Sequence, residues 1–292
     1  MPTINVTEGC AHGCAYCYIR GYPGYPGASR VILFDNIPEL VRAELSRKRR
    51  PPARVYFSPS SDAFQPLAEV RQVTYETMSS LLARGVEVAF LTKGRVGERF
   101  GAMFARRPGR VFAQVGITTL SGDLARATEP RAASPAERLR TIDRLVRAGV
   151  ATTARLDPLV PDLTDTEENL RPLLAELRRR GVRTVAASYL FLRPALAPRI
   201  AETLRILTGW SHAAGDWRWH RFADGVGGGR MIGPEARRER FWRLRALAAA
   251  RGIEVRVCAC KNPDLPFARD CRIAGPEPAA GRHAEAPLFG TP

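Results

Sequence analysis

Short apolar segments rich in β-branched residues recur along the first two thirds of the chain, separated by longer amphipathic segments. We expect each apolar segment to form a buried strand, because its length and composition suit one. These strands are predicted at residues 3–7, 54–58, 86–92, 111–118, 151–156 and 184–189. The helical periodicity of the intervening segments predicts helices at residues 36–49, 70–84, 95–107, 134–148 and 166–180.

Glycine and proline mark the ends of several predicted helices. Gly85, Gly149 and Gly181 each follow the last apolar turn of a helix, where a left-handed cap is favoured. The run Ser-Pro-Ala-Glu at residues 134–137 is typical of a helix start, with serine as the N-cap and proline in the first turn. These signals support the division into strands and helices.

Strands that alternate with helices predict a parallel sheet joined by right-handed crossovers. Six such units predict an α/β fold, a partial (β/α)6 barrel that is open on one side, and we assign residues 1–195 to it. In barrels of this kind the chemistry lies at the carboxyl ends of the strands. We therefore look for functional residues just after each predicted strand.

A different pattern follows the predicted barrel. Residues 196–274 are expected to form a C-terminal extension, with helices near 197–208 and 234–250 and a last strand at 253–257. Residues 275–292 are rich in proline, alanine and glycine, and we expect this tail to be disordered.

Composition indicates a globular protein from a reducing compartment. Hydrophobic residues make up 45% of the chain and charged residues 25%, which is ordinary for a soluble domain. No stretch approaches the roughly 18 uninterrupted apolar residues of a membrane span, and the N-terminus does not resemble a secretory signal. The six cysteines are gathered into two triplets, which predicts metal-bound thiolates in the cytoplasm rather than disulfides.

The formal net charge of +16 favours polyanionic partners, because neutralising phosphates releases condensed counterions. Most of the basic residues are arginines, and the only lysines are Lys48, Lys93 and Lys261. A biased coding composition accounts for such an arginine excess equally well. Charge alone therefore only slightly favours a nucleic-acid substrate.

The first cysteine triplet carries the strongest chemical signal in the chain. Cys10, Cys14 and Cys17 have the spacing Cys-x3-Cys-x2-Cys and follow the first predicted strand. Three thiolates in one short loop suit three irons of a four-iron cluster, and leave the fourth iron for a small molecule. The alternative is a zinc site with His12 as fourth ligand, which requires a very tight wrap of the loop.

The triplet, with Tyr16 before its last cysteine, resembles the signature of the radical S-adenosylmethionine (SAM) superfamily. Further stretches resemble the spore photoproduct lyase family and its homologues within that superfamily. They lie at residues 9–18, 58–66, 91–94, 117–120 and 129–135. The resemblance implies a barrel of the radical SAM type, a [4Fe-4S] cluster and SAM as cofactors. It also implies cleavage of SAM to a 5′-deoxyadenosyl radical, and a reducing partner such as ferredoxin or flavodoxin.

The resemblance also implies roles for individual cofactor-binding residues. Ser61 and Lys93 are expected to hold the SAM carboxylate, with Asp62 beside them at the end of the second predicted strand. Tyr16 is expected near the adenine, or alternatively as a packing residue at the barrel mouth.

Two further pairs follow later strands. Thr118 and Thr119 are expected to contact the ribose of SAM. Glu129 and Arg131 are candidate cofactor residues, or alternatively an ion pair that fixes their own loop.

One departure from the family pattern bears on the substrate. Spore photoproduct lyases carry a cysteine near the end of the second strand that returns a hydrogen atom to the product. Residues 58–60 are Ser-Pro-Ser here, and no cysteine lies outside the two triplets. We therefore expect a lyase-like homologue with another substrate.

The second triplet comprises Cys258, Cys260 and Cys271, flanked by prolines and polar turns that suit a core poorly. The favoured interpretation is an auxiliary iron–sulfur cluster. The alternatives are a zinc site with His283 or another residue as a further ligand, and a strained redox pair of Cys258 and Cys260. The segment 217–221, Trp-Arg-Trp-His-Arg, suits either the stacking of nucleic-acid bases or the packing of the extension on the barrel.

Three functions are compatible with these patterns. The favoured one is a radical SAM enzyme that acts on a nucleic acid or nucleotide. The second is a radical SAM biosynthetic enzyme that acts on a small molecule or peptide with help from an auxiliary cluster. The third is a non-catalytic metal-binding protein that binds nucleic acid. The sequence does not predict an oligomeric state.

Overall fold

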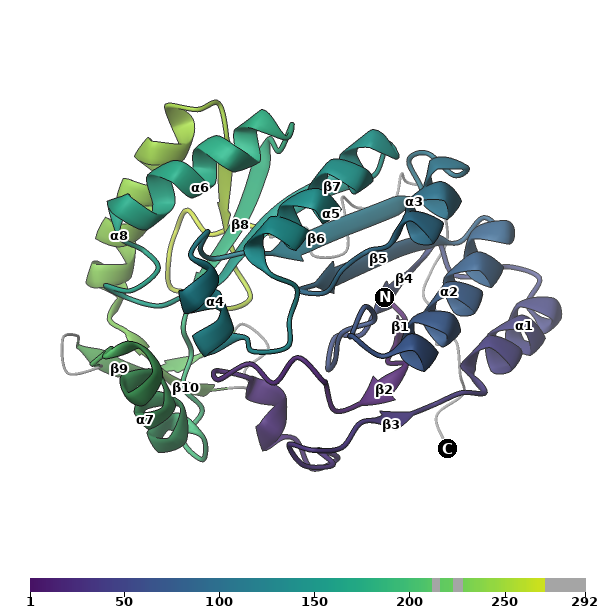
Figure 1. Ribbon diagram of the computed structural model, residues 1–292, viewed down its shortest axis with the longest axis horizontal. Coiled ribbons are helices and arrows are strands. Elements are labelled where there is room, and N and C mark those ends of the chain that lie inside the picture. Colours follow the sequence, from purple (N-terminus) through teal and green to yellow (C-terminus); the bar gives the residue numbers. More distant parts are fainter. Residues whose placement is uncertain (212–215, 223–227, 271–292) are drawn as a thin grey trace.

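The computed structural model describes residues 1–211, 216–222 and 228–270, and its main feature is a seven-stranded parallel sheet (Figure 1). The strand order is β1-β4-β5-β6-β7-β8-β11, and every neighbouring pair runs parallel. All six predicted strands are present. The seven strands are β1 (Thr3–Ile4), β4 (Arg54–Phe57), β5 (Glu87–Thr92), β6 (Val111–Gly116), β7 (Ala151–Leu159), β8 (Thr184–Tyr189) and β11 (Glu254–Val257).

The seventh strand comes from the predicted extension. In the register of β11 with β8, Val255 lies beside Val185 and Val257 beside Ala187. The extension therefore completes the sheet, and residues after β11 emerge at the carboxyl ends of the other strands. The α/β partial barrel is confirmed, and the strand predicted at 253–257 in the extension joins the six predicted barrel strands as the seventh.

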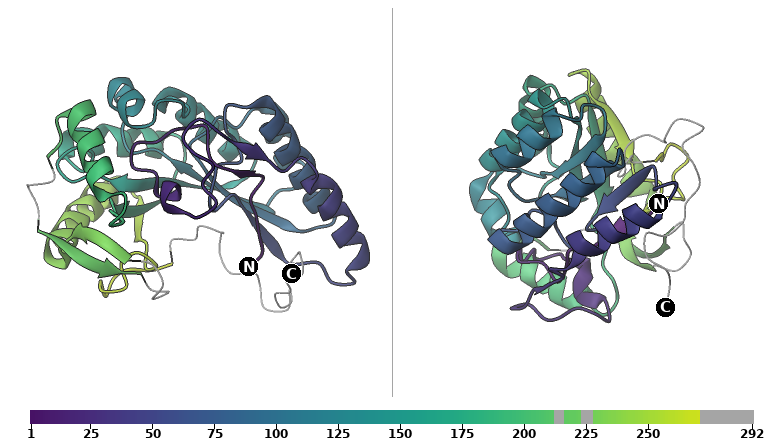
Figure 2. Two further views of the ribbon diagram at one scale, coloured as in Figure 1. Left: turned by 90° about the horizontal axis from the view of Figure 1, so that it is seen from below. Right: turned by 90° about the vertical axis from the view of Figure 1, so that its right-hand side faces the viewer.

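Helices cover one face of the curved sheet, as the turned views in Figure 2 show. The predicted helices are all present, and α4 is an additional short helix that the sequence did not predict. The helices are α1 (Ile37–Arg47), α2 (Ala68–Ala83), α3 (Glu98–Ala105), α4 (Gly122–Thr128), α5 (Pro135–Arg147), α6 (Glu167–Arg179), α7 (Ala197–Thr208) and α8 (Pro234–Ala249).

Local signals explain where these helices begin and end. Ser134 accepts a hydrogen bond from the Glu137 amide, and Glu137 accepts one from the Ser134 amide, so the predicted capping box is formed. Gly85, Gly149 and Gly181 adopt φ values of 73°, 70° and 80°, which glycine tolerates without strain.

The two faces of the sheet differ in character because successive side chains point to opposite sides. In β6, Val111 and Val115 belong to the main hydrophobic core. On the other face, the Gln114 side chain accepts a hydrogen bond from Arg155 of β7 at 2.9 Å, and an Arg54–Glu87 ion pair joins β4 and β5 at 2.6 Å. The barrel interior is therefore polar, which suits a binding site better than a packed core.

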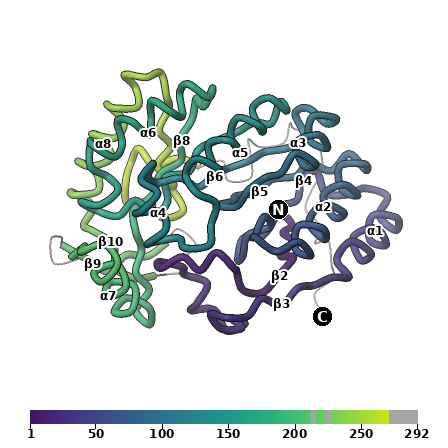
Figure 3. The backbone as a smooth tube through the Cα atoms, viewed as in Figure 1, coloured from purple at the N-terminus to yellow at the C-terminus, as the bar shows by residue number. Residues whose placement is uncertain are grey.

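A β-hairpin flanks the open side of the barrel. It consists of β9 (Trp217–Arg221) and β10 (Gly228–Ile232), and lies beside α7 in Figure 3. Trp210 anchors it: this side chain is 7% exposed, and its ring lies 6.0 Å from that of Trp217. Trp219, in contrast, is 58% exposed. The hairpin thus has an anchoring tryptophan pair and one outward tryptophan.

The N-terminal segment folds over the lower edge of the sheet in Figure 1. Two short strands, β2 (Thr7–Glu8) and β3 (Ile32–Leu33), pair in antiparallel fashion, and a 3₁₀ helix, η1 (Tyr18–Gly21), lies between them. None of the helices in the described part of the chain has the length and hydropathy needed to cross a membrane. Cys271, His283 and the predicted tail at 275–292 lie outside the described residues.

Candidate cofactor site

The three N-terminal cysteines line one cavity. Cys10, Cys14 and Cys17 lie in the loop between β2 and η1, around a cavity of about 360 Å³. The loop needs glycine at Gly9, where φ is +80° and a Cβ atom would lie 2.7 Å from a backbone oxygen. The remaining walls of the cavity come from Gly13, Ile19, Arg20, Tyr25, Ala28, Pro130 and Arg131.

A buried carboxylate ties this loop to the sheet. Asp62, after β4, is 5% exposed, and its Oδ1 accepts hydrogen bonds from Thr92 Oγ1 at 2.7 Å and from the Phe64 amide at 2.8 Å. Its Oδ2 accepts from the Lys93 amide at 2.8 Å and lies 3.1 Å from His12 Nε2. Asp62 therefore positions the cysteine loop relative to β5, while a direct contact with SAM stays a prediction.

A buried amide adds a second tie. Gln65 is fully buried, and its Oε1 accepts a hydrogen bond from the Ala11 amide at 2.6 Å. Its Nε2 donates to Thr7 Oγ1 at 2.9 Å, just before the cysteines. Because buried polar groups fix geometry when all their partners are present, these contacts hold the cysteine loop in one arrangement.

Both ring nitrogens of His12 face groups other than the cysteines, so the zinc alternative for this loop stays a prediction. Its ring is 2% exposed, with Nε2 facing Asp62 and Nδ1 lying 3.3 Å from the Arg131 carbonyl. Across the part of the chain that the structure describes, no three Cys, His, Asp or Glu side chains are arranged to share one metal ion. A four-iron cluster makes a different demand, because each of three cysteines binds its own iron.

The state of the thiols fits a site that is completed by metal. Burial raises the pKa of Cys10 and of Cys17, and raises the pKa of Cys14 to about 12. The nearby Asp62 carboxylate adds to this rise at Cys10, and the Glu129 carboxylate adds to it at Cys14. Without a metal the thiols keep their protons at neutral pH, so binding of iron must release them. The fit to the cluster implied by the spacing rests on the geometry, because all three thiols line the same cavity.

Tyr16 and Glu129 belong to a buried network beside the cysteines. The Tyr16 hydroxyl donates to Glu129 Oε1, and Arg138 of α5 pairs with Glu129 Oε2. Arg138 also donates to the Gly116 carbonyl at 3.0 Å. The predicted alternative of a Glu129–Arg131 ion pair is wrong: α5 brings Arg138 back to Glu129, and Arg131 instead lines the cysteine cavity.

The structure brings Lys93 close to Tyr16. Lys93 Nζ lies 5.6 Å from the centroid of the Tyr16 ring and donates to the Asp157 carbonyl at 3.3 Å. Thr118 and Thr119 are 7% and 4% exposed and begin the loop that leads to α4. Their contact with a ribose stays a prediction.

Two serines after β4 present buried hydroxyl groups. Within the described residues, Ser58 Oγ and Ser61 Oγ have no hydrogen-bond partner. Ser58 also adopts φ = 54°, a left-handed backbone that is uncommon outside glycine. Strained residues and unsatisfied buried polar groups concentrate where ligands bind. These hydroxyls therefore support a ligand site at the end of β4.

A pair of residues that the sequence did not single out completes the polar interior. Lys261 Nζ donates to both carboxylate oxygens of Asp157, at 3.0 and 2.9 Å, and Arg155 donates to Asp157 Oδ2 at 2.8 Å. Burial opposes ionisation of Asp157, but Lys261 and Arg155 hold its pKa well below the usual range. The rarity of lysine in this chain is the one sequence signal that pointed toward Lys261.

The C-terminal cysteines are arranged unlike the first triplet. Cys258 is 3% exposed and packs against Ala186 of β8, whereas Cys260 is exposed. Cys271 is outside the described part of the chain. The auxiliary cluster, the zinc site and the redox pair therefore all stay predictions.

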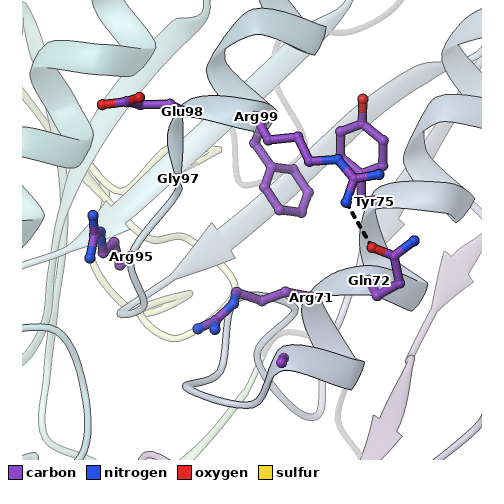
Figure 4. A pocket seen from close by; sticks show the side chains of 9 residues that line it. Arg71, Gln72, Tyr75, Arg95, Gly97, Glu98 and Arg99 are labelled. Atoms are coloured by element: carbon purple, nitrogen blue, oxygen red, sulfur yellow. Dashed lines mark hydrogen bonds between the residues drawn. The ribbon is translucent and has the colours of Figure 1, made fainter.

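A second cavity of about 360 Å³ lies between the first turns of α2 and α3 (Figure 4). Arg71, Arg95 and Arg99 contribute to its lining. Arg99 stacks over the Tyr75 ring at 3.7 Å and donates to Gln72 at 2.7 Å. Because α2 follows β4 and α3 follows β5, this basic cavity lies at the same edge of the sheet as the cysteine loop.

Solved structures with the same fold include spore photoproduct lyase. A cysteine-to-serine mutant of that lyase superposes with a TM-score of 0.68 and 17% identity, over 88% of this chain and 76% of the lyase. A double mutant with bound AdoMet and dinucleoside spore photoproduct gives a TM-score of 0.67 and 16% identity, over 87% of this chain and 75% of the lyase. At these identities the likeness concerns the fold alone.

Sequence relatives include an uncharacterized protein of Mycobacterium tuberculosis, 28% identical over 65% of this chain and 59% of the relative. The radical SAM Nalpha-GlyT isomerase of Pseudomonas phage M6 is 29% identical over 67% of this chain and 40% of the isomerase. The aligned region thus spans about three fifths or less of these relatives. The family model of the radical SAM superfamily matches residues 4–174, and the chain belongs to that superfamily.

Proposed function

We propose that this protein is a radical SAM enzyme that abstracts a hydrogen atom from a nucleic acid or nucleotide. The observation that carries the proposal is the shared cavity of Cys10, Cys14 and Cys17, held beside Tyr16 and Lys93 at the carboxyl edge of the sheet. When bound there, a [4Fe-4S] cluster and SAM supply one-electron reduction and a 5′-deoxyadenosyl radical. A reduced ferredoxin or flavodoxin in the cytoplasm provides the electron.

The chain's own residues bind and orient the cofactor in this proposal. Lys93 offers a cation for the carboxylate of SAM, and the buried Ser61 hydroxyl offers a hydrogen-bond donor. Glu129 fixes the Tyr16 ring through its hydroxyl, so that the ring forms a rigid wall of the site. Asp62 and Gln65 hold the cysteine loop in register with these groups.

Two surface features support a nucleic-acid substrate. Trp219 is 58% exposed on the hairpin, directly across from Arg230, an arrangement that suits a base stacked on the indole beside a phosphate. The cavity of Arg71, Arg95 and Arg99 offers further cations at the catalytic edge. The lyase of the same fold has been seen with a dinucleoside spore photoproduct.

The chemistry after hydrogen abstraction differs from that of the lyases in this proposal. Ser58 stands in the segment where those enzymes carry a hydrogen-donating cysteine, and a serine hydroxyl does not give up a hydrogen atom as a thiol does. A biosynthetic radical SAM enzyme for a small molecule or peptide is the second candidate. It is favoured by Cys258 and Cys260, which follow β11 close to Lys261 in the sequence and are candidate ligands of an auxiliary cluster.

Two measurements on the anaerobically reconstituted protein test the favoured function. The first is formation of 5′-deoxyadenosine from SAM with dithionite, which the radical chemistry requires. The second is binding of a single-stranded DNA oligonucleotide at rising salt concentrations. Where binding depends on phosphate contacts, the logarithm of the binding constant falls linearly with the logarithm of the salt concentration. Absence of 5′-deoxyadenosine would leave only a binding role, and binding that is indifferent to salt would favour the small-molecule or peptide substrate.

A pair of tryptophans provides a matched test of the surface. We expect Trp219→Ala to weaken oligonucleotide binding about fivefold to hundredfold, because base stacking contributes roughly 1–3 kcal/mol per base. Trp242→Ala is the control, since Trp242 of α8 is similarly exposed (54%) but its ring packs beside Phe267. Equal effects of the two substitutions would contradict a stacking role for the hairpin.

A further inference from the structure

The loop after β11 inserts a lysine into the barrel beside the SAM site. Lys261 Nζ bonds both oxygens of Asp157, at the carboxyl end of β7. The backbone carbonyl of the same Asp157 accepts from Lys93 Nζ at 3.3 Å. Lys261 lies outside residues 4–174, so it is not part of the region that the superfamily model matches.

Buried contacts hold the Lys261 backbone in place. His220 Nε2 of the hairpin lies 2.7 Å from the Lys261 carbonyl. Arg237 of α8, 1% exposed, donates to Asn262 Oδ1 at 2.7 Å and to the Ile232 carbonyl at 2.9 Å. The lysine is therefore aimed at Asp157 by two neighbouring elements, unlike a flexible surface lysine.

Hydrogen-bonding capacity remains around this pair. Asp157 Oδ2 accepts from Arg155 and Lys261, whereas Oδ1 accepts from Lys261, so Oδ1 retains a lone pair. The ammonium of Lys261 has three donors, and its bonds to Asp157 use two of them. Ser188 of β8 is fully buried, and its Oγ has no hydrogen-bond partner within the described residues.

The strand register places Ser188 beside the pair. Leu156 of β7 lies next to Ala187, and Leu159 lies next to Tyr189. Ser188 therefore lies opposite the irregular segment of β7 that contains Asp157. A buried donor without a partner is costly, and such groups are usually satisfied by a ligand or ordered water. The register thus places Ser188 on the strand next to the pair, while the donor and the acceptor that lie side by side are those of Lys261 and Asp157.

This combination selects the chemistry of the ligand. A phosphate or carboxylate bound to Lys261 would lie against the ionised Asp157, which like-charge repulsion disfavours. A neutral carbonyl next to an N–H satisfies the pair, since the carbonyl accepts from Lys261 while the N–H donates to Asp157. We propose that Asp157 and Lys261 form a substrate subsite for the imide edge of a pyrimidine base; this rests on the proposed function.

The test measures discrimination against an N-methylated ligand. The reconstituted, SAM-loaded and unreduced enzyme is titrated with thymidylyl-thymidine and with its N3-methylated form. In a second arm it is titrated with a glycine-rich peptide amide and its N-methylated form. We expect a preference of about 10- to 100-fold for the N–H form in the dinucleotide arm, as hydrogen bonds to charged groups give. A preference confined to the peptide arm would overturn the assignment to a base and favour the peptide substrate.

Variants assign that preference to the proposed residues. Asp157→Asn is expected to reduce the discrimination to less than about threefold, because the neutral amide loses the charged acceptor. Lys261→Met is expected to weaken both ligand forms alike, and Lys261→Arg to restore most of the binding. Lys48→Met removes the lysine of a partly buried Lys48–Glu44 pair at the end of α1 and should leave binding of both ligands unchanged. Thermal unfolding of each variant separates lost binding from lost folding.

Two results would overturn the subsite. One is wild-type enzyme that binds methylated and unmethylated ligands equally in both arms, and the other is discrimination that survives in folded Asp157→Asn. The proposed function fails separately, if wild-type enzyme forms no 5′-deoxyadenosine from SAM. Discrimination without 5′-deoxyadenosine would retain the subsite and reject the radical chemistry, because binding is measured without reduction.

Discussion

The two cysteine triplets have the same number of thiols, but the loops that carry them are built differently. The N-terminal loop places Cys10, Cys14 and Cys17 on one cavity and ties its backbone to the barrel through buried side chains of other βα loops. The C-terminal loop buries Cys258 against the sheet and exposes Cys260. The side chain of this loop that forms an ion pair inside the barrel is that of Lys261.

The difference shows that a cysteine count does not define a metal site by itself. Three thiols become a site when the backbone around them is fixed, because binding then costs little reordering. Asp62 and Gln65 supply that fixation for the first loop. Arg237 fixes the backbone of the second loop through Asn262, and this contact orients Lys261 rather than a cysteine.

Replacing the cysteines gives the largest expected effect. Cys10, Cys14 and Cys17 changed together to alanine should abolish 5′-deoxyadenosine formation and remove about four irons per chain. If the C-terminal triplet holds a second four-iron cluster, wild type should contain about eight irons and the variant about four. Iron and sulfide analysis after anaerobic reconstitution provides the measurement.

Replacing the C-terminal cysteines tests whether the second triplet also binds a cluster. Cys258 and Cys260 changed together to alanine should lower the iron content by about half if they bind a cluster. An unchanged content of about four irons would leave the second triplet to zinc or to structure. A zinc assay of the same samples decides between these two.

Much of the fold followed from the sequence because the signals are local. Apolar periodicity located the six strands, and Gly85, Gly149 and Gly181 ended their helices as expected. The helix α4 was missed because its seven residues are too few to show a period. The pairing of β11 with β8 was missed because it is non-local.

The site was predictable only where its residues form a motif. The cysteines share one loop, so their spacing was sufficient to bring them together. Glu129 was expected to pair with a neighbour in its loop, but α5 returns Arg138 to it. Asp157 and Lys261 are 104 positions apart. They meet only in the folded barrel, so no local sequence pattern could predict their contact.

Removing the carboxylate that holds the first loop should be strongly destabilising. Asp62→Ala leaves His12, Thr92 and two backbone amides without their acceptor in a buried place. We expect a loss of about 3–5 kcal/mol in the free energy of unfolding, measured with urea. Asp123→Ala is the control, because Asp123 pairs with Arg126 on an exposed surface and should change stability by less than about 1 kcal/mol.

The corresponding change in the second loop should cost less. Arg237→Met removes the donor to Asn262 and to Asp264, but the Asp264 side chain is 35% exposed and water can replace part of the loss. We expect about 2 kcal/mol, with hydrogen exchange accelerated after β11 and unchanged around the N-terminal cysteines. The exposed Arg238→Met on the same helix is the control. Accelerated exchange in both loops would mean that they are not independent.

The smallest effect concerns pH and is confined to the second loop. Burial lowers the pKa of His220, and the neighbouring Arg237 cation lowers it further, against the opposing effect of the Asp264 carboxylate. The folded protein therefore holds His220 neutral at a pH where the unfolded chain, with a histidine pKa of about 6.5, already takes up a proton. The contribution of His220 to stability is complete above that pH and is lost as pH falls through the folded pKa.

Urea unfolding at pH 7.5 and at pH 5.5 isolates this contribution when wild type is compared with His220→Gln. The wild type should lose more stability on acidification than the variant, since glutamine has no proton to take up. Glutamine retains a donor for the Lys261 carbonyl, so the two proteins should be similar at pH 7.5. Equal losses on acidification would show that His220 is not held neutral. The hairpin would then anchor the Lys261 loop in the same way at both pH values.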